Sequence, residues 1–254
     1  MPEGIRAVFL DLDGVLYIGD DPIDGAAEAV ARLRAAGLKL AGLTNTTTQS
    51  RRQIAEKLAR LGIPLSEKDL FTPAALARAR IGRRRVRLFV RDALREDFAG
   101  IQEDAAHPEV VVMGDIGGEG YPPEALREIF LAVLDGAELI ALHKNRFWKK
   151  PDGLHLDLGA FVAAIEYATG VEATVVGKPA RAFFLGVCQA LGVSPEEALM
   201  VGDDIESDIL GAHKAGLKTA LVHTGKYRAD FAERVMRAHA FRPDLELASI
   251  AELG

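Results

Sequence analysis

Short apolar runs alternate along this chain with longer stretches in which apolar side chains recur every three or four residues. The short runs are typical of strands and the longer periodic stretches of helices, so the pattern predicts βαβ units and a parallel sheet. The expected strands cover Ala7–Leu10, Leu38–Leu43, Val86–Val90, Val110–Met113, Glu138–Leu142, Ala173–Val176, Ala198–Val201 and Thr219–Val222. The expected helices cover Ala26–Ala36, Ser50–Leu61, Pro123–Leu134, Leu158–Thr169, Ala180–Leu191 and Asp208–Ala215.

Six arginines between Arg78 and Arg87 interrupt this pattern. A dense basic tract can bind nucleic acid, but aromatic side chains are not interleaved through this one and the whole chain is acidic. A solvated surface or a linker between domains is therefore the favoured interpretation. We place a domain boundary near the tract, which predicts a core domain of residues 1–79 and 174–254 and an inserted domain of residues 80–173.

The composition limits the classes of protein to which this chain can belong. With 254 residues and 49% hydrophobic content, the chain can bury a sizeable core. Its net charge of −6 speaks against a dedicated nucleic-acid partner. The single cysteine, Cys188, excludes an intrachain disulfide and fits a reducing compartment. Because the sequence shows neither a secretory leader pattern nor a membrane-spanning apolar run, we expect a cytoplasmic protein that does not bind membranes.

Chemically distinctive side chains stand where four of the predicted strands end. They are Asp11 and Asp13, Thr44 and Asn45, Lys178, and Asp203, Asp204 and Asp208. In an open parallel sheet the carboxyl ends of the strands lie along one edge, so these side chains are expected to meet in one crevice. Taken singly, each stretch could be an ordinary turn or cap. In this order, each behind a predicted strand, they indicate an active site.

The residue types indicate phosphoryl chemistry. Asp11, Asp13 and Asp203 offer oxygen ligands of the kind that Mg²⁺ prefers. Lys178 supplies a positive charge for a phosphate, and the Thr44–Asn45 pair supplies a hydroxyl, an amide and backbone N–H groups near the start of a helix. A carboxylate can receive a phosphoryl group, and a metal ion, a lysine and N–H donors stabilise its transfer.

Four ordered motifs carry a resemblance to a known family. They are Asp11-Leu12-Asp13-Gly14-Val15, Leu43-Thr44-Asn45, Gly177-Lys178-Pro179 and Gly202-Asp203-Asp204-Ile205-Glu206-Ser207-Asp208. In this order they resemble the motifs of haloacid dehalogenase superfamily phosphatases, and the resemblance covers essentially the whole chain. It implies an α/β fold: a Rossmann-like, doubly wound parallel-sheet core with a smaller α/β cap domain inserted between the second and third motifs.

A closer resemblance lies in four further stretches. They are Lys149–Leu154, Glu166–Ala168, Val175–Pro179 and Thr224–Arg228. These resemble the branch of the superfamily that contains phospholysine phosphohistidine inorganic pyrophosphate phosphatase. They are distinctive for the branch and do not specify a substrate.

The superfamily resemblance implies a role for each site residue. Asp11 is the expected nucleophile, which forms an aspartyl-phosphate, and Asp13 is expected to protonate the leaving group and then to activate water. Mg²⁺ is expected to bind the carboxylates of Asp11 and Asp203 and the backbone carbonyl of Asp13. Lys178 is expected to offset the negative charge of the nucleophile and the phosphate.

The two remaining acids, Asp204 and Asp208, belong to the same motif as Asp203. Asp208 is expected to orient Lys178 or a metal-bound water rather than to ligate the metal. The choice for Asp204 stays open between orienting and ligating. The acid at position 13, two residues after the nucleophile, also argues against carbon–halogen cleavage, because dehalogenases of this superfamily lack it.

The inserted domain is expected to determine the substrate. A cap over the crevice favours small phosphorylated metabolites, and the branch resemblance permits phosphoesters, pyrophosphate or compounds with P–N bonds. Contacts with the leaving group are expected from Gly117–Tyr121 or Asn145–Trp148, which could instead be a flexible connection and a hydrophobic anchor. Such caps can also carry a homodimer interface. A slow or inactive phosphometabolite-binding regulatory protein is the alternative function, and the intact set of site residues favours the enzyme.

Overall fold

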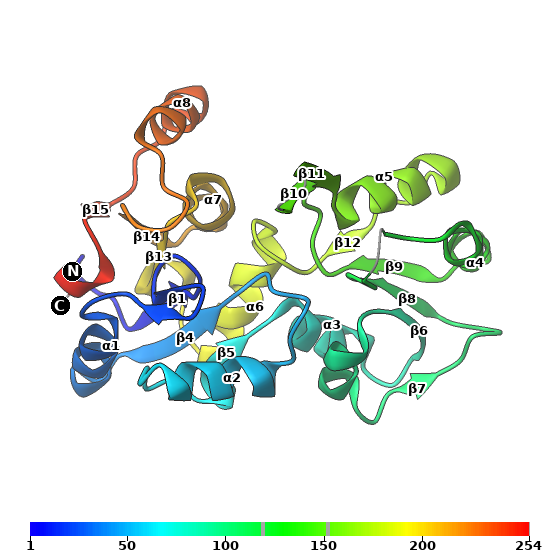
Figure 1. Cartoon of the computed structure of the whole chain (residues 1–254), viewed down its shortest axis with the longest axis horizontal. Helices are drawn as coiled ribbons and strands as arrows, with labels where there is room; N and C mark the ends of the chain where they lie inside the picture. The colour runs from blue at the N-terminus through cyan, green and yellow to red at the C-terminus, as the bar shows by residue number, and fades with distance from the viewer. Residues whose placement is uncertain (118–119, 151–152, 254) are drawn as a thin grey trace. The chain divides into compact units, whose positions relative to one another are not determined.

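A computed structural model describes residues 1–117, 120–150 and 153–253 of the chain, whose elements are labelled in Figure 1. Contacts divide the chain into two compact units. The first unit comprises Met1–Thr44, Arg51–Phe71 and Lys178–Gly254, and the second comprises Asn45–Ser50 and Thr72–Gly177. Each unit contains a parallel sheet with helices, so the predicted α/β class is confirmed.

The first unit is built on a sheet with the strand order β15-β14-β13-β1-β4-β5, in which every pairing is parallel. Strand β1 lies at its centre, with Phe9 opposite Ala41 on one side and Met200 on the other. The strands are β1 (Ala7–Asp11), β4 (Lys39–Leu43), β5 (Leu70–Phe71), β13 (Ala198–Gly202), β14 (Lys218–Val222) and β15 (Leu245–Leu247). The chain order reverses between β1 and β13, which is where an open α/β sheet has its binding crevice.

Helices cover both faces of this sheet, as its sequence pattern requires. On one face, Val8 and Leu10 of β1 share a core with the buried sides of α1 and α2. Leu221 of β14 points to the opposite face, where it packs with Val235 of α8. Strands buried on both sides are continuously apolar instead of alternating, and β1 and β13 have that pattern. The helical elements are α1 (Ala26–Ala35), α2 (Arg51–Arg60), α6 (Arg181–Leu191), η4 (Ile205–Leu210), α7 (Gly211–Ala215) and α8 (Ala229–His239).

Shorter elements complete the first unit. The paired strands β2 and β3 follow the first motif, and single helical turns lie beside β5, β13 and β15. Their bounds are β2 (Tyr17–Ile18), β3 (Asp21–Pro22), η1 (Glu67–Asp69), η3 (Pro195–Glu197) and η5 (Ile250–Glu252).

The second unit has a sheet and a hydrophobic core of its own. Its parallel sheet has the order β12-β9-β8-β6-β7, and β10 and β11 form a separate antiparallel pair. The strands are β6 (Arg85–Phe89), β7 (Gln102–Glu103), β8 (Val110–Met113), β9 (Glu138–Ala141), β10 (Phe147–Lys150), β11 (Gly153–Leu156) and β12 (Thr174–Val175). The helical elements are α3 (Pro73–Ile81), η2 (Asp92–Phe98), α4 (Pro123–Leu134) and α5 (Leu158–Thr169).

One predicted strand belongs to the other sheet. The run Ala173–Val176 was expected to end in the core crevice, but its strand β12 pairs with β9 of the second unit, where Thr174 lies opposite Ile140. A short apolar run does not specify its partner strand, because pairing depends on residues far away in the sequence. Lys178 therefore reaches the first unit from the segment that leads into α6, and not from a strand of the core sheet.

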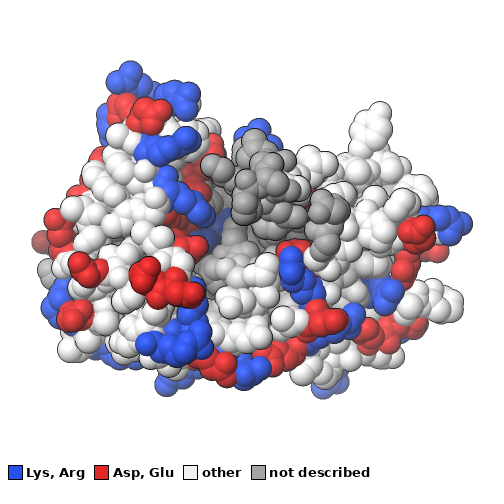
Figure 2. All heavy atoms as spheres, viewed as in Figure 1, with Lys and Arg blue, Asp and Glu red and all other residues white. Residues whose placement is uncertain are grey.

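The arginine-rich tract is also part of the second unit. Its residues run from the end of α3 through the short turn at residues 82–84 to the start of β6, and so it is not a free linker. Arg80 and Arg84 each donate to Glu138 at 2.6 Å, and Arg87 donates to Glu128 at 2.6 Å. Of the two interpretations offered by the sequence, the structure fits the solvated surface, since these arginines are partly exposed and paired with acids. Basic and acidic side chains are interspersed on the face seen in Figure 2. In the described part of the chain, every helix is too short or too polar to span a bilayer.

Candidate active site

Asp11 and Lys178 form a buried ion pair at the end of the central strand. Asp11 is the last residue of β1, and one of its carboxylate oxygens lies 2.5 Å from Lys178 Nζ. The ammonium group also lies 2.6 Å from Oδ1 of Asp208. Burial disfavours the charge of Lys178, but the carboxylates of Asp11 and then Asp208 outweigh it and raise the pKa of the lysine. Lys178 therefore stays protonated at neutral pH.

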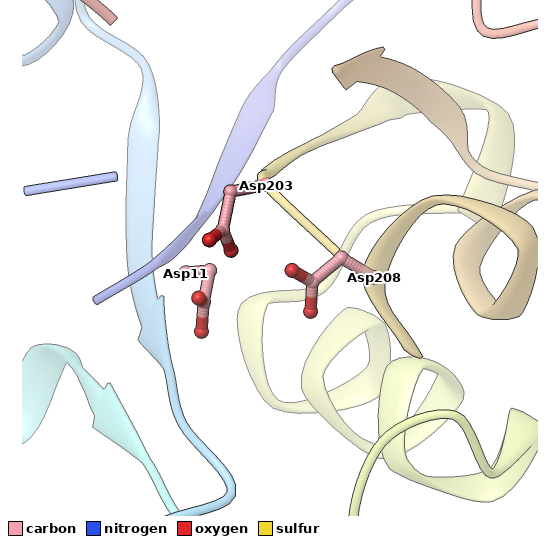
Figure 3. Close-up of side chains that lie close together, drawn as sticks. All are labelled: Asp11, Asp203 and Asp208. Carbon is pink, nitrogen blue, oxygen red and sulfur yellow. The ribbon is translucent and has the colours of Figure 1, made fainter. Parts of the chain in front are cut away.

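Asp203 lies beside Asp11 at the end of the neighbouring strand β13, with Asp208 facing them (Figure 3). Ligand oxygens of these three acids lie within 4.8 Å of one another. Burial, with the Asp11 charge as the next cause, raises the pKa of Asp203 to about 6. Its Oδ2 accepts the backbone N–H of Lys226 at 2.6 Å, whereas its Oδ1 is buried and accepts no hydrogen bond from the part of the chain that the structure describes. A buried oxygen of this kind fits a cation ligand.

Asp208 and Asp204 contact different partners. Oδ2 of Asp208 accepts the backbone N–H of Asp204 at 3.3 Å, and burial raises the pKa of the Asp208 carboxyl against the opposing charge of Lys178. The Asp204 carboxylate accepts the backbone N–H groups of Glu206 and Ser207, each at 3.0 Å, and so caps η4. Asp208 thus faces the lysine, while Asp204 is engaged at the start of a helix.

Asp13 lies in the tight loop that follows β1, and its side chain is exposed. The loop bends at Gly14, which has φ +97° and donates its N–H to the carbonyl of Tyr17 at 2.7 Å. A side chain at position 14 would collide with the Asp203 carboxylate, so this close approach requires glycine. Burial raises the pKa of Tyr17, and Asp13 and then Asp11 add to the shift.

Thr44 and Asn45 follow β4, the other neighbour of β1. Thr44 is buried and its N–H donates to the carbonyl of Phe71 in β5 at 3.3 Å, which ties this loop to the edge strand. Contacts assign Thr44 to the first unit, and Asn45 begins the segment Asn45–Ser50 that is counted with the second.

The sequence-based reasoning missed the turn that follows β14 as part of the site. There the hydroxyl of Thr224 donates to the carbonyl of Gly14, and Lys226 provides the N–H that Asp203 accepts. Carboxylates, with Asp11 as the largest contributor, raise the pKa of Lys226 against the effect of burial. The rule that selected the other loops applied here as well, because β14 is a core strand and this turn begins at its carboxyl end.

A pocket of about 340 Å³ lies within the second unit. Its lining includes the buried His143, the carboxylates of Asp115 and Asp157, and the ring of Phe161. His143 Nδ1 accepts the backbone N–H of Asn145 at 3.4 Å, and burial lowers the pKa of the imidazole. The pocket therefore combines polar groups with an aromatic wall, as small-molecule sites do.

Both loops expected to contact the leaving group are only partly described. Gly117, Gly120 and Tyr121 of the first loop line this pocket, as does Asn145 of the second. Arg146 of the second loop is exposed and is not among the residues that line the pocket. The other expected contacts lie outside the described residues or side chains: Gly118, Glu119, Phe147 and Trp148.

Comparisons with known proteins show which family the chain resembles along its length. Residues 8–102 match the family model described as haloacid dehalogenase-like hydrolase, and residues 175–253 match the one described as HAD-hydrolase-like. The human haloacid dehalogenase-like hydrolase domain-containing protein 2 is 45% identical over 235 residues, which cover 92% of this chain and 90% of the relative. The Xenopus laevis phospholysine phosphohistidine inorganic pyrophosphate phosphatase is 42% identical, covering 89% and 86%.

Solved structures agree with the sequence matches. The p-nitrophenyl phosphatase from Archaeoglobus fulgidus superposes with a TM-score of 0.89 at 26% identity, covering 98% of both chains. The resemblance to this superfamily, and to the branch with the pyrophosphate phosphatase, is confirmed.

Proposed function

This chain belongs to the haloacid dehalogenase-like hydrolases and is a phosphatase of that family. We propose that it acts on small phosphorylated metabolites by transferring their phosphoryl group to Asp11. The observation that carries this proposal is the buried Asp11 carboxylate at the end of the central strand, with Lys178 at 2.5 Å and Asp203 beside it. Lys178 balances the charge of a carboxylate that must meet an anionic phosphate.

The reaction we propose has two displacements at phosphorus. A carboxylate oxygen of Asp11 forms a bond to phosphorus, the bond from phosphorus to the leaving group breaks, and Asp13 gives the departing atom its proton. Asp13 then takes a proton from water as the water oxygen bonds to phosphorus, and the bond between phosphorus and the Asp11 oxygen breaks. Inorganic phosphate leaves, and both carboxyl groups return to their starting states. The exposed position of Asp13, two residues beyond the nucleophile, suits a group that exchanges protons with the leaving group and water.

We propose that the carboxylates of Asp11 and Asp203 and the backbone carbonyl of Asp13 hold Mg²⁺. The buried Oδ1 of Asp203, which accepts no hydrogen bond within the described chain, supports this assignment. When bound, Mg²⁺ supplies positive charge that stabilises the charge developing on the phosphoryl oxygens.

The other site residues either hold these groups in position or bind the phosphate. Asp208 orients Lys178 through the 2.6 Å ion pair, and Asp204 fixes the start of η4, the helix that carries Asp208. Thr44 and Asn45 contribute hydroxyl, amide and N–H groups to the phosphate. In this proposal the inserted residues 80–173 form the cap domain that selects the leaving group.

We propose substrate classes from the compounds for which the relatives are named. One relative is named for pyrophosphate, phospholysine and phosphohistidine, and a structural neighbour for p-nitrophenyl phosphate. Phosphate esters, inorganic pyrophosphate and P–N compounds are therefore the first compounds to test.

The decisive experiment replaces the nucleophile. Asp11→Asn should abolish Mg²⁺-dependent phosphate release, because an amide cannot accept the phosphoryl group. Asp20→Asn is the matched control, since Asp20 lies in the same unit with a nearly fully exposed side chain (96%), and it should leave turnover unchanged. Acid quenching of the wild type during turnover should trap phosphate on the peptide that contains Asp11, detected by mass spectrometry.

Two results would contradict the proposal. Substantial hydrolysis by folded Asp11→Asn would remove Asp11 as the nucleophile. Tight binding of phosphorylated compounds by the wild type, with negligible turnover of every class tested, would identify a regulatory binding protein instead.

A further inference from the structure

The turn after β14, residues 223–227, contacts the segments that provide two of the three proposed magnesium ligands. The backbone N–H of Lys226 donates to Oδ2 of Asp203 at 2.6 Å. The hydroxyl of Thr224 donates to the backbone carbonyl of Gly14, the residue that follows Asp13. One short turn therefore holds both Asp203 and the loop that contains Asp13.

Close packing at Gly225 strengthens this connection. Gly225 has φ +56°, and a Cβ at this position would collide with Oδ2 of Asp203 and with the Cα of Gly14. The backbone of the turn thus lies directly against both partners. A larger residue could enter only if the turn, the Asp203 carboxylate or the Gly14 loop moved.

The turn has internal contacts that fix its shape. The N–H of Tyr227 donates to the carbonyl of Thr224 at 3.1 Å, and the rings of His223 and Tyr227 stack with centroids 4.0 Å apart and an angle of 10° between their planes. The N–H of His223 donates to the carbonyl of Leu247 in β15 at 2.9 Å. The first residue of the turn is therefore tied to β15 and its last residue is folded back onto the first two, so its contacts to Asp203 and Gly14 start from an ordered backbone.

We propose that residues 223–227 are a positioning element for the magnesium site, which we call the clamp turn. The N–H of Lys226 in the clamp turn occupies Oδ2 of Asp203 and leaves Oδ1 for the metal ion. Thr224 holds the carbonyl of Gly14, and so fixes the preceding Asp13, whose backbone carbonyl is the third proposed ligand. The inference rests on the proposed function, because it assumes that these groups hold Mg²⁺. Preorganised ligands bind a metal more tightly, because less rotational freedom is lost on binding.

Thr224 offers the cleanest test, because its hydroxyl can be removed at nearly constant volume. Thr224→Val should weaken Mg²⁺ binding to the whole, metal-free protein by roughly tenfold or more, measured by isothermal titration calorimetry, in line with the effect of lost partners around metal ligands. Thr224→Ser keeps the hydroxyl and should bind Mg²⁺ nearly as the wild type does. The Mg²⁺ concentration that gives half-maximal activity should rise in Thr224→Val by the same factor as the dissociation constant, with a smaller change in kcat at saturating Mg²⁺.

Thr219→Val is the matched control. Thr219 is buried in β14, the strand that leads into the clamp turn, and its hydroxyl contacts Asp244 and not the site. This variant removes an equivalent group from β14 and should keep the Mg²⁺ affinity of the wild type. An equal loss of affinity in Thr219→Val would mean that general destabilisation explains the effect, and the clamp turn would be rejected.

The outcomes separate this inference from the proposed function. A wild type that binds no Mg²⁺ would overturn the metal assignment, and the clamp turn with it. A wild type that binds Mg²⁺, together with a folded Thr224→Val that binds it equally well, would overturn the clamp turn alone. If circular dichroism shows Thr224→Val to be unfolded, Thr224→Ala takes its place with the same expected loss, and undiminished binding by that variant rejects the inference.

Discussion

At the scale of single residues, the first motif supplies two carboxylates with different surroundings. Asp11 is buried, with Lys178 Nζ 2.5 Å away, whereas Asp13 is exposed. A buried carboxylate held beside a cation is fixed in direction, which suits a nucleophile. An exposed carboxylate can exchange protons with water and with a leaving group, which suits an acid and base.

This difference predicts how Asp13→Asn changes the dependence on the leaving group. The variant should lose about 10²- to 10⁴-fold in kcat/KM for alkyl phosphates, whose leaving groups need a proton. It should lose much less for p-nitrophenyl phosphate, because nitrophenolate departs without one. The measurement is kcat/KM for a series of aryl and alkyl phosphates, plotted against the leaving group's pKa.

The plot for Asp13→Asn should be steeper than the plot for the wild type. Parallel plots, with equal losses for good and poor leaving groups, would argue against proton transfer by Asp13. Asp21→Asn serves as the control, because Asp21 is an exposed acid of the neighbouring β3.

At the scale of elements, the sequence predicted those whose pattern is local. The predicted bounds of β8, α4 and α5 agree with the structure to the residue. Strand β5 was missed because its two residues are too few to show a period. Helix α8 was missed although its sequence is amphipathic, with Ala232, Val235 and Met236 buried on one side, so a local signal was present there.

The sequence also allowed only part of the candidate site to be predicted. Asp11, Lys178 and Asp203 could be grouped from sequence because each stands in a distinctive motif at the end of a predicted strand. The strand before Lys178 was wrongly assigned to the core sheet, since β12 pairs in the sheet of the second unit. The turn at Thr224 also follows a predicted core strand and could have been grouped by the same rule. Its hydrogen bond to Gly14 could not, because it joins residues 210 positions apart and no local pattern encodes that contact.

Helix η4 yields a prediction that separates a helix cap from a metal ligand. Asp204 accepts two N–H groups at the start of η4, so Asp204→Ala should lower the free energy of unfolding by about 1 kcal/mol. Asp204→Ser should recover most of that stability, because a serine hydroxyl also caps helices. Both variants should bind Mg²⁺ with the wild-type affinity. The measurements are urea denaturation and calorimetric titration with Mg²⁺.

A loss of Mg²⁺ binding in Asp204→Ser, at wild-type stability, would show that Asp204 ligates the metal instead. Glu206→Gln provides the control for charge, since Glu206 is an exposed acid on the same element.

At the scale of the whole molecule, the two compact units have separate hydrophobic cores. Ile140 and Val112 belong to a cluster formed entirely by residues of the second unit, and Ile54 and Leu58 belong to one formed entirely by residues of the first. All the residues proposed for the metal site lie in the first unit. Stability of the second core and metal binding should therefore be separable.

Ile140→Ala tests this separation. Ile140 is fully buried in β9, so its truncation should destabilise the second unit by about 2–5 kcal/mol. Hydrogen–deuterium exchange followed by mass spectrometry should become faster in peptides from residues 72–177, with little change elsewhere, and Mg²⁺ affinity should stay at the wild-type value. Ile54→Ala, at an equally buried position of the first core, should produce the reverse pattern of exchange. If each substitution accelerates exchange equally in both units, the chain unfolds as one cooperative body and the two cores are not energetically independent.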